Sequence, residues 1–186
     1  MLNVKAKLTY ADYLKTSDDE RYELLNGELV LSPSPKEIHQ YISSVLHILI
    51  GTFAREHNLG RVYFSPFDVV LSDTNVVQPD LLFVSNKRTQ IITPDNIRGA
   101  PDLVVEILSP STAELDRTTK LELYARHGVT EYWIVDPSAK TIMVLLLGQH
   151  RFEVGGIYGK GHILQSPTLE GFRLPIEEVF KASLET

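Results

Sequence analysis

Apolar residues recur along the chain at two spacings, and the two spacings separate helices from strands. Between Lys36 and His57 the apolar positions fall three or four residues apart, which predicts a long helix ended by Asn58–Leu59–Gly60. These positions are Ile38, Ile42, Val45, Leu46, Leu49, Ile50 and Phe53.

Shorter helical segments are predicted where capping residues precede apolar ones. Thr9 and Asp12 form one such pair, and Ser111 and Glu114 form another near the start of the second main helix. The predicted segments are a short helix over Tyr10–Lys15, a helix that opens at Ser109–Thr112, runs to Arg126 and ends at Gly128, and a terminal turn over Pro175–Phe180.

Strands are predicted where apolar residues alternate or run together between turn residues. Asn26–Gly27 is a strong hairpin signal, and Ser32–Pro33–Ser34–Pro35 ends that hairpin. Ser85–Ala100 is expected to be irregular, with one helical turn. The predicted strands are Tyr22–Leu25, Glu28–Leu31, Arg61–Phe64, Phe67–Leu71, Val76–Val84, Asp102–Leu108, Glu131–Val135, Ile142–Leu147, Phe152–Tyr158 and His162–Leu164.

This order of elements predicts an α/β (α+β) fold, in which helices flank a mixed central β-sheet. The fold would carry an N-terminal hairpin and extra strands towards the C-terminus. No repeat, linker or low-complexity tract interrupts the 186 residues, so residues 1–186 are expected to form a single domain.

Composition narrows the class of protein. The chain is 43% hydrophobic and 23% charged, with a net charge of −6, which argues against a dedicated DNA-coating protein but leaves room for a local basic groove. The absence of cysteine excludes disulfides, thiolate zinc sites and a cysteine nucleophile. The six histidines form no HExxH pair.

Residues 1–20 lack a charged start followed by an apolar core, and the longest apolar runs, such as Val45–Ile50 and Ile142–Leu147, are too short to span a bilayer. We therefore expect a cytoplasmic protein without a membrane partner. The strands within residues 141–174 carry no chemical motif. An apolar strand edge there would permit a homodimer, and sheet completion is the simpler interpretation.

Two carboxylates stand in the most apolar part of the chain. Asp80 follows Pro79, which suits the first residues of a strand. Glu106 interrupts the run LVVEIL, so it is expected to be buried and to need a cation, a hydrogen-bond network or a proton. Converging acids would hold a divalent metal that activates water. Alternatively, Asp80 caps a turn and Glu106 pairs with a buried arginine.

Lys120 lies on the second main helix, one turn after Asp116 and one turn before Tyr124. Such acid–lysine pairs commonly stabilise an exposed helix by roughly 0.2–0.5 kcal/mol. In the functional alternative, Lys120 leans over the sheet and offsets the charge that builds on a phosphate, with Arg117 and Tyr124 as neighbours.

Two further polar residues have competing interpretations. The pattern around Glu23 favours a solvated strand acid, and His39 is either a partly exposed first-turn residue or a group near the metal or phosphate. The loop cations Lys87, Arg88 and Arg98 either hold a phosphate or are solvated, whereas Tyr132 and Trp133 are expected in the core or an interface.

Several stretches together resemble the Uma-type branch of the PD-(D/E)XK nuclease superfamily, a group of restriction-endonuclease-like proteins. They are RYELLNGELVLSPSP, HQ, VVQPDLLFV, APDLVVEILSPST and DRTTKLELYARHGVTEYWIVDP, and they cover most of the chain from Arg21 to Pro137. The resemblance implies a restriction-endonuclease-like core with Asp80 and Glu106 as metal ligands. It also implies that Glu23 and His39 complete the pocket.

One position departs from the superfamily pattern. The expected lysine two residues after Glu106 is Leu108, which cannot donate to water. In the Uma-type branch this lysine is taken to lie on the following helix, which matches Lys120.

The resemblance therefore implies an endonuclease that cuts nucleic acid, with DNA the expected substrate. Mg²⁺, or Mn²⁺, would be held by Asp80, Glu106 and the Ile107 carbonyl, and Lys120 would orient water or stabilise charge. Leu108 and the acidic net charge leave a second function open, a nuclease-fold module that binds nucleic acid or a partner protein without cutting. A two-carboxylate glycosidase has less support, because only one tryptophan could serve as a sugar platform.

Overall fold

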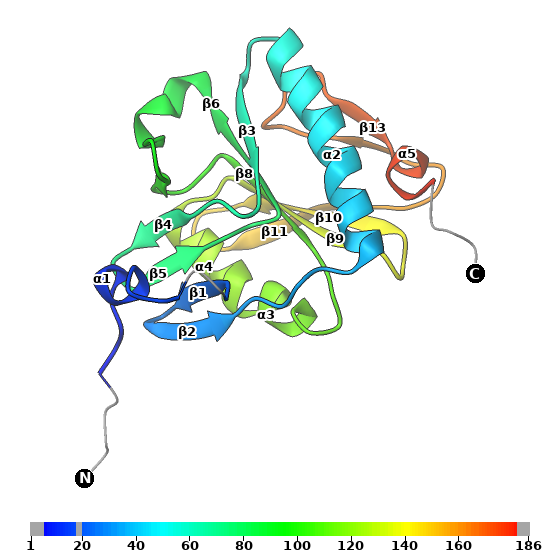
Figure 1. Ribbon diagram of the computed structural model, residues 1–186. Coiled ribbons are helices and arrows are strands. Elements are labelled where there is room, and N and C mark those ends of the chain that lie inside the picture. The colour runs from blue at the N-terminus through cyan, green and yellow to red at the C-terminus, as the bar shows by residue number, and fades with distance from the viewer. Residues whose placement is uncertain (1–5, 18–19, 182–186) are drawn as a thin grey trace.

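Two large β-sheets and one small sheet form the framework of the computed structural model, which describes residues 6–17 and 20–181 (Figure 1). The elements in chain order are α1 (Tyr10–Tyr13), β1 (Tyr22–Leu25), β2 (Glu28–Leu31), α2 (Glu37–Glu56), β3 (Gly60–Phe64), β4 (Val69–Ser72), β5 (Asn75–Val77), β6 (Leu81–Ser85), the 3₁₀ helix η1 (Asn86–Ile91), β7 (Ile97–Arg98), β8 (Leu103–Ile107), α3 (Ala113–Arg117), α4 (Thr119–His127), β9 (Glu131–Asp136), β10 (Thr141–Leu147), β11 (Phe152–Tyr158), β12 (Ile163–Gln165), β13 (Arg173–Pro175) and α5 (Ile176–Phe180).

The central sheet has six strands in the order β11-β10-β9-β8-β6-β3. It is mixed, because β8 and β9 run parallel while the other neighbouring pairs are antiparallel. Every residue of β8 is buried, as expected of a strand covered on both faces. A second sheet of five strands, in the order β2-β1-β5-β4-β7, contains the N-terminal hairpin. The predicted mixed sheet with flanking helices is therefore confirmed.

Helices and the other sheets cover both faces of the central sheet. On one face α2 buries Ile42, Leu46 and Ile50 against Val105 and Trp133, and the C-terminal elements β12, β13 and α5 extend the same core. Figure 1 shows α2 beside α5 and β13, and α3 and α4 beside the β1–β2 hairpin. On the opposite face α4 and the five-stranded sheet pack against alternate residues of β8.

The N-terminal hairpin and the long helix are confirmed. Asn26 and Gly27 both have positive φ, 52° and 84°, as the tight turn between β1 and β2 requires. The observed α2 differs from the predicted range by one residue at each end. The Thr9/Asp12 pair is present, because the Asp12 carboxylate accepts hydrogen bonds from Thr9 N and Oγ1.

The single strand predicted over Val76–Val84 is wrong. The chain instead leaves the five-stranded sheet at Val77, crosses through Gln78–Pro79–Asp80 and enters the six-stranded sheet at Leu81. Pro79 has no N–H to give to a strand ladder, which explains why pairing stops there.

The single helix predicted from Ser109–Thr112 to Arg126 is also wrong, because it is broken into α3 and α4 at Thr118. Thr118 has φ −125° and ψ −82°, and its hydroxyl donates to the Glu114 carbonyl. A threonine bonded to the i−4 carbonyl in this way bends a helix. The Ser111/Glu114 capping pair does not form, since Ser111 contacts Ser109 and the helix begins at Ala113.

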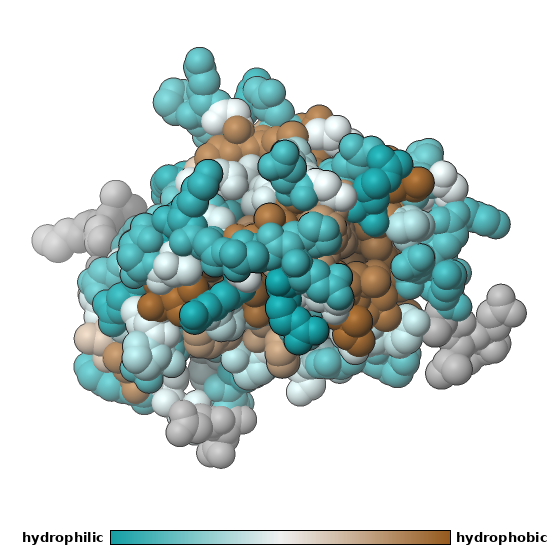
Figure 2. All heavy atoms as spheres, turned by 90° about the horizontal axis from the view of Figure 1, so that it is seen from above, coloured by the Kyte–Doolittle hydropathy of each residue, from teal (hydrophilic) through white to brown (hydrophobic). Residues whose placement is uncertain are grey.

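The remaining differences concern short elements. α1 is shorter than predicted, β4 begins at Val69 instead of Phe67, and two short strands, β7 and β13, carry too few residues for a periodic signal. In Figure 2 hydrophobic surface shows in patches between hydrophilic side chains. Among the described residues no helix is long and apolar enough to cross a membrane.

Candidate active site

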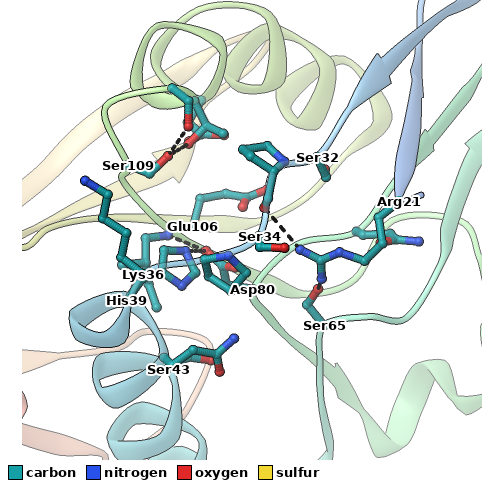
Figure 3. A pocket seen from close by; sticks show the side chains of 18 of the residues that line it. Arg21, Ser32, Ser34, Lys36, His39, Ser43, Ser65, Asp80, Glu106 and Ser109 are labelled. Atoms are coloured by element: carbon teal, nitrogen blue, oxygen red, sulfur yellow. Dashed lines mark hydrogen bonds and ion pairs between the residues drawn. The ribbon is translucent and has the colours of Figure 1, made fainter. Parts of the chain in front are cut away.

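A pocket of about 350 Å³ lies where the start of α2, the end of β8, the β5–β6 crossing and the two short helices meet. All six residues that the sequence singled out line it: Glu23, His39, Asp80, Glu106, Ile107 and Lys120. They come from five separate parts of the chain, and Figure 3 shows His39, Asp80 and Glu106 directed into the same space.

Lys120 is buried among three carboxylates. Its Nζ lies 2.9 Å from Glu23 Oε2, 3.0 Å from Glu106 Oε1 and 3.5 Å from Asp116 Oδ1. The residue is only 4% exposed, so the alternative of a solvated helix pair is wrong. Burial alone would lower the pKa of Lys120, but Glu106 and Glu23 outweigh it and raise that pKa well above its usual value. Lys120 is therefore an ammonium group at neutral pH.

Glu106 has one occupied and one unoccupied oxygen. Oε1 accepts from Lys120 Nζ at 3.0 Å and from the Tyr124 hydroxyl at 2.6 Å, whereas no described residue donates to Oε2. Its partner is thus a lysine and not the buried arginine of the alternative interpretation. Its alternate neighbours Val104 and Leu108 pack in the core on the α4 side, so Glu106 lies on that face of β8.

Asp80 lies immediately before β6, and, as in Glu106, only one of its two carboxylate oxygens has protein partners in the described chain. Its Oδ2 accepts from the Ile107 backbone N–H at 2.7 Å and lies 3.1 Å from His39 Nε2. No described residue donates to Oδ1. Burial lowers the pKa of His39, but the hydrogen bond and negative charge of Asp80, together with Ile107 and Asp116, raise that pKa overall. The chain thus places Asp80 next to the backbone of the residue that follows Glu106.

Glu23 differs from the other two acids because both of its oxygens are engaged. Oε1 accepts from the Gln78 backbone N–H at 2.7 Å, and Oε2 pairs with Lys120 at 2.9 Å. Only 3% of Glu23 is exposed, so the solvated strand acid favoured by its sequence context is wrong. Glu23 therefore fixes the position of Lys120, and a protein donor occupies each of its oxygens.

The pocket holds a surplus of negative charge. Burial raises the pKa of Glu106 well above its usual value, Lys120 opposes the rise, and Asp116 and Asp80 add to it. The pKa of Asp116 is raised for the same reasons, burial first. One ammonium group does not neutralise this many neighbouring carboxylates, so a further cation in the pocket would be stabilised.

Three buried polar atoms lack a hydrogen-bond partner among the described residues, and all three belong to residues of this pocket: His39 Nδ1, Gln78 Oε1 and Asp116 Oδ1. Buried polar groups without partners commonly mark a place for water or an ion.

The donor atoms of the pocket suit Mg²⁺. This ion takes one or two carboxylates and keeps several of its waters, and the free oxygens of Asp80 and Glu106 are hard donors of that kind. Over residues 6–17 and 20–181, no group of three or more His, Asp or Glu side chains is arranged to hold a metal.

Cations and hydroxyl groups line the mouth of the pocket. Among the residues that the structure describes, the Arg21 side chain makes only long contacts, 3.4 Å to Ser65 Oγ and 3.4 Å to the Pro33 carbonyl. Figure 3 shows it directed into the pocket. Lys36 lies on the opposite side, at the start of α2. These groups give an anion two positive contacts beside the acids.

Other residues named from the sequence do not reach the pocket. Arg117 pairs with Asp136 at 2.8 Å, so its expected place beside Lys120 is wrong. None of the loop cations Lys87, Arg88 and Arg98 lines the pocket. Arg88 pairs with Asp102, and Arg98 lies over the Tyr10 ring. Tyr132 and Trp133 are core residues, as expected, because neither is exposed.

The local sequence around Asp116 favours an exposed ion pair with Lys120, whereas the structure buries Asp116 beside the pocket. Asp116, Lys120 and Tyr124 repeat every fourth residue, and all are buried on one side of the broken helix. A buried stripe that contains an acid, a lysine and a tyrosine was the available signal. Arg21 and Gln78 had no such signal, because they reach the pocket only through the tertiary fold.

The fold and this acidic pocket define a restriction-endonuclease-like protein. The chain is similar to a solved structure described as a putative nuclease belonging to DUF820 from Anabaena variabilis, with 22% identity and a TM-score of 0.79 over 94% of this chain and 98% of the other. The chain belongs to the Uma2 family, described as "Putative restriction endonuclease", which matches residues 9–177. The comparison with curated proteins found no match.

Proposed function

We propose that this protein is a metal-dependent endonuclease that hydrolyses phosphodiester bonds of DNA. One observation carries the proposal: the Lys120 ammonium lies within 3.5 Å of three carboxylates, in a pocket whose acids Asp80 and Glu106 each keep one free oxygen. The nuclease class follows from the family, and the residue roles below are our proposal.

Asp80, Glu106 and the Ile107 carbonyl would hold Mg²⁺ or Mn²⁺ through oxygen atoms. When bound, such an ion makes a coordinated water more acidic and polarises a phosphate oxygen. Asp80 is oriented by the Ile107 N–H, and Glu106 is oriented by Tyr124 and Lys120. These hydrogen bonds set the free oxygens before any ligand arrives, which reduces the reorganisation needed on binding.

Lys120 serves as a donor and not as a base, because its raised pKa keeps it protonated. Its ammonium group stabilises the negative charge that grows on the phosphate and orients the attacking water. Glu23 positions this ammonium group, and His39 supports Asp80 from the other side. Arg21 and Lys36 would hold the substrate phosphate at the mouth of the pocket.

Plasmid cleavage with Mg²⁺ or Mn²⁺ tests this assignment. We expect nicking by the wild type, its loss on chelation with EDTA, and a loss of at least a hundred-fold in Asp80→Asn, Glu106→Gln and Lys120→Met. Arg117→Ala removes a cation on the preceding helix that lies outside the pocket, so it serves as the matched control and should cut normally.

The same assay distinguishes a nuclease from a nuclease-fold module that binds nucleic acid without cutting it. Cleavage that survives in all three pocket variants would contradict the assignment of residues. DNA binding by the wild type without any cleavage, with either metal, would replace the nuclease by the nucleic-acid-binding alternative.

A further inference from the structure

A second concavity lies between α2 and β3 and has the opposite charge character to the acidic pocket. Its lining includes Arg55 on α2 and Arg61 on β3, together with His47 and Tyr63, and it contains no acidic residue. Both arginines are exposed, and neither forms an ion pair with any residue in the described part of the chain. In a chain of net charge −6, this is a local positive groove.

An exposed aromatic pair joins this groove to the acidic pocket. Phe64, at the end of β3, lines the pocket and is 54% exposed. His47 lines the groove, and its ring centroid lies 4.5 Å from that of Phe64. The two concavities therefore meet at this pair of tilted rings, of which Phe64 is exposed.

Helix α2 forms one wall of both concavities. Ser43 lines the pocket, and His47, Gly51 and Arg55 line the groove at four-residue intervals along one side of the helix. At about 1.5 Å per residue, the stretch from Ser43 to Arg55 is ~18 Å long. One side of α2 therefore runs without interruption from the pocket into the groove.

We infer that the groove between α2 and β3 holds a single strand of nucleic acid that continues from the pocket, with an unpaired base stacked on Phe64. This inference rests on the proposed function and adds the class of substrate to it. Arg55 and Arg61 attract the backbone phosphates through charge, and an aromatic face accepts any unpaired base. In a duplex the bases are stacked on each other, so contact with the Phe64 ring requires an unpaired segment.

Gly51 offers a test that leaves every native side chain in place. A Cβ at this position would have only ordinary contacts with the His47 ring, the nearest atoms being 3.8 Å and 3.9 Å away. Replacing a mid-helix glycine also favours the helix, so folding is not expected to suffer. Gly51→Glu puts a negative charge into the groove, and Gly51→Gln adds nearly the same volume without the charge.

The experiment measures binding of a fluorescent twelve-residue thymidine oligonucleotide and of a blunt hairpin duplex by anisotropy, in EDTA so that cleavage is prevented. We expect Gly51→Glu to weaken single-strand binding at least ten-fold relative to Gly51→Gln. Phe64→Ala should weaken it by about five-fold to a hundred-fold, the range for loss of one stacked base. The double variant of Arg55→Gln and Arg61→Gln should reduce the salt slope by about 1.4. Val154→Ala, at a similarly exposed apolar residue on β11, is the control.

Three results would overturn the inference. Equal single-strand binding by Gly51→Glu and Gly51→Gln would show that the strand does not lie in the groove. A loss that is equal for the hairpin and the single strand would show that the groove tracks duplex DNA. Dissociation of a dimer in Gly51→Glu, seen by size exclusion with light scattering, would show that a second copy of the chain occupies the groove.

Different results would contradict the nuclease site and the nucleic-acid groove. Normal cleavage by the Asp80 and Lys120 variants would contradict the nuclease site while the groove variants still affect binding. Plasmid cleavage that depends on Lys120 but not on Phe64, Arg55 or Arg61 would contradict the groove alone.

Discussion

The Tyr124 hydroxyl donates to Glu106 Oε1 at 2.6 Å, and both side chains are buried. The same oxygen also accepts from Lys120, so two donors fix the orientation of a carboxylate whose other oxygen has no protein partner in the described chain. Tyr124 is therefore a positioning residue for the proposed metal site, one that touches neither metal nor substrate.

Tyr124→Phe should destabilise the protein and weaken its affinity for Mg²⁺. A hydrogen bond to a charged group contributes about 2 kcal/mol, which corresponds to roughly 4–8 °C in Tm for a chain of this size. Calorimetric titration should show Mg²⁺ bound several-fold more weakly. Tyr132→Phe is the matched control, because its equally buried hydroxyl donates to the Asp116 backbone carbonyl at 3.0 Å. Equal Mg²⁺ affinity in the two variants would refute the positioning role.

Asp116→Asn should stabilise the metal-free protein at neutral pH. Burial raises the pKa of the Asp116 carboxyl above 3.8, so ionising this group is harder in the folded state than in the unfolded state. An acid with a raised folded pKa favours folding most at low pH, and that contribution is lost as the pH rises from the unfolded pKa through the folded one.

The Tm of Asp116→Asn should therefore exceed that of the wild type by a few degrees at pH 8, and the two values should converge near pH 4. Differential scanning calorimetry across this range measures the difference. Asp95→Asn, which changes an exposed acid, should show no such trend. If the wild type is instead the more stable protein at pH 8, the attraction between Asp116 and Lys120 outweighs the cost of burying Asp116 beside Glu23 and Asp80.

Mg²⁺ should stabilise the folded protein by an amount that rises with the logarithm of its concentration above Kd. A ligand present at 100 times its Kd adds about 2.7 kcal/mol, or roughly 5–10 °C in Tm here. EDTA should reverse the shift, and Asp80→Asn and Glu106→Gln should abolish it, while Arg117→Ala keeps it. The measurement is a thermal shift without substrate. A shift that persists unchanged in both pocket variants would place the ion elsewhere.

Glu131→Gln should loosen the C-terminal elements without affecting the pocket. The Glu131 side chain is completely buried, and it accepts from Trp133 Nε1 at 2.6 Å, Ser166 Oγ at 2.8 Å and Thr168 N at 3.0 Å. An amide at this position would turn a donor towards other donors, which costs about 1–3 kcal/mol.

Urea unfolding followed by the fluorescence of Trp133, the only tryptophan, measures this loss, and limited proteolysis should cut within residues 166–180. Glu153→Gln, on the exposed surface of β11, should leave both readouts unchanged. A Trp133 spectrum and a urea midpoint identical to those of the wild type would contradict the role given to Glu131.

The sequence predicts the periodic parts of this fold well and its interruptions poorly. The hairpin at Asn26–Gly27, the long α2 and the buried β8 follow from local turn chemistry and spacing. The spacing of apolar residues continues across Pro79 and Thr118, so it predicts one strand and one helix where the structure has two of each. A proline or a bonded threonine decides the local conformation at such points more strongly than the pattern does.

The candidate site shows the same division. Glu106 is identifiable as a buried charge because its own strand has no polar face. Lys120 and Glu23 each fit an exposed interpretation locally, and only the packing of α4 over β8 and β1 makes them buried partners. Arg21 and Phe64 carry no local sign of their place beside the pocket, since exposure is set by what the tertiary fold leaves uncovered.

The chain passes from one large sheet to the other through Gln78–Pro79–Asp80, and both polar ends of this crossing are tied to the pocket, Gln78 N to Glu23 and Asp80 to Ile107 N. Any separation of the two sheets must therefore break the bonds that shape the pocket. An ion bound in the pocket should therefore also stabilise the packing of the two sheets against each other. The amide protons of Gln78 and Ile107 should then exchange with solvent more slowly once an ion is bound.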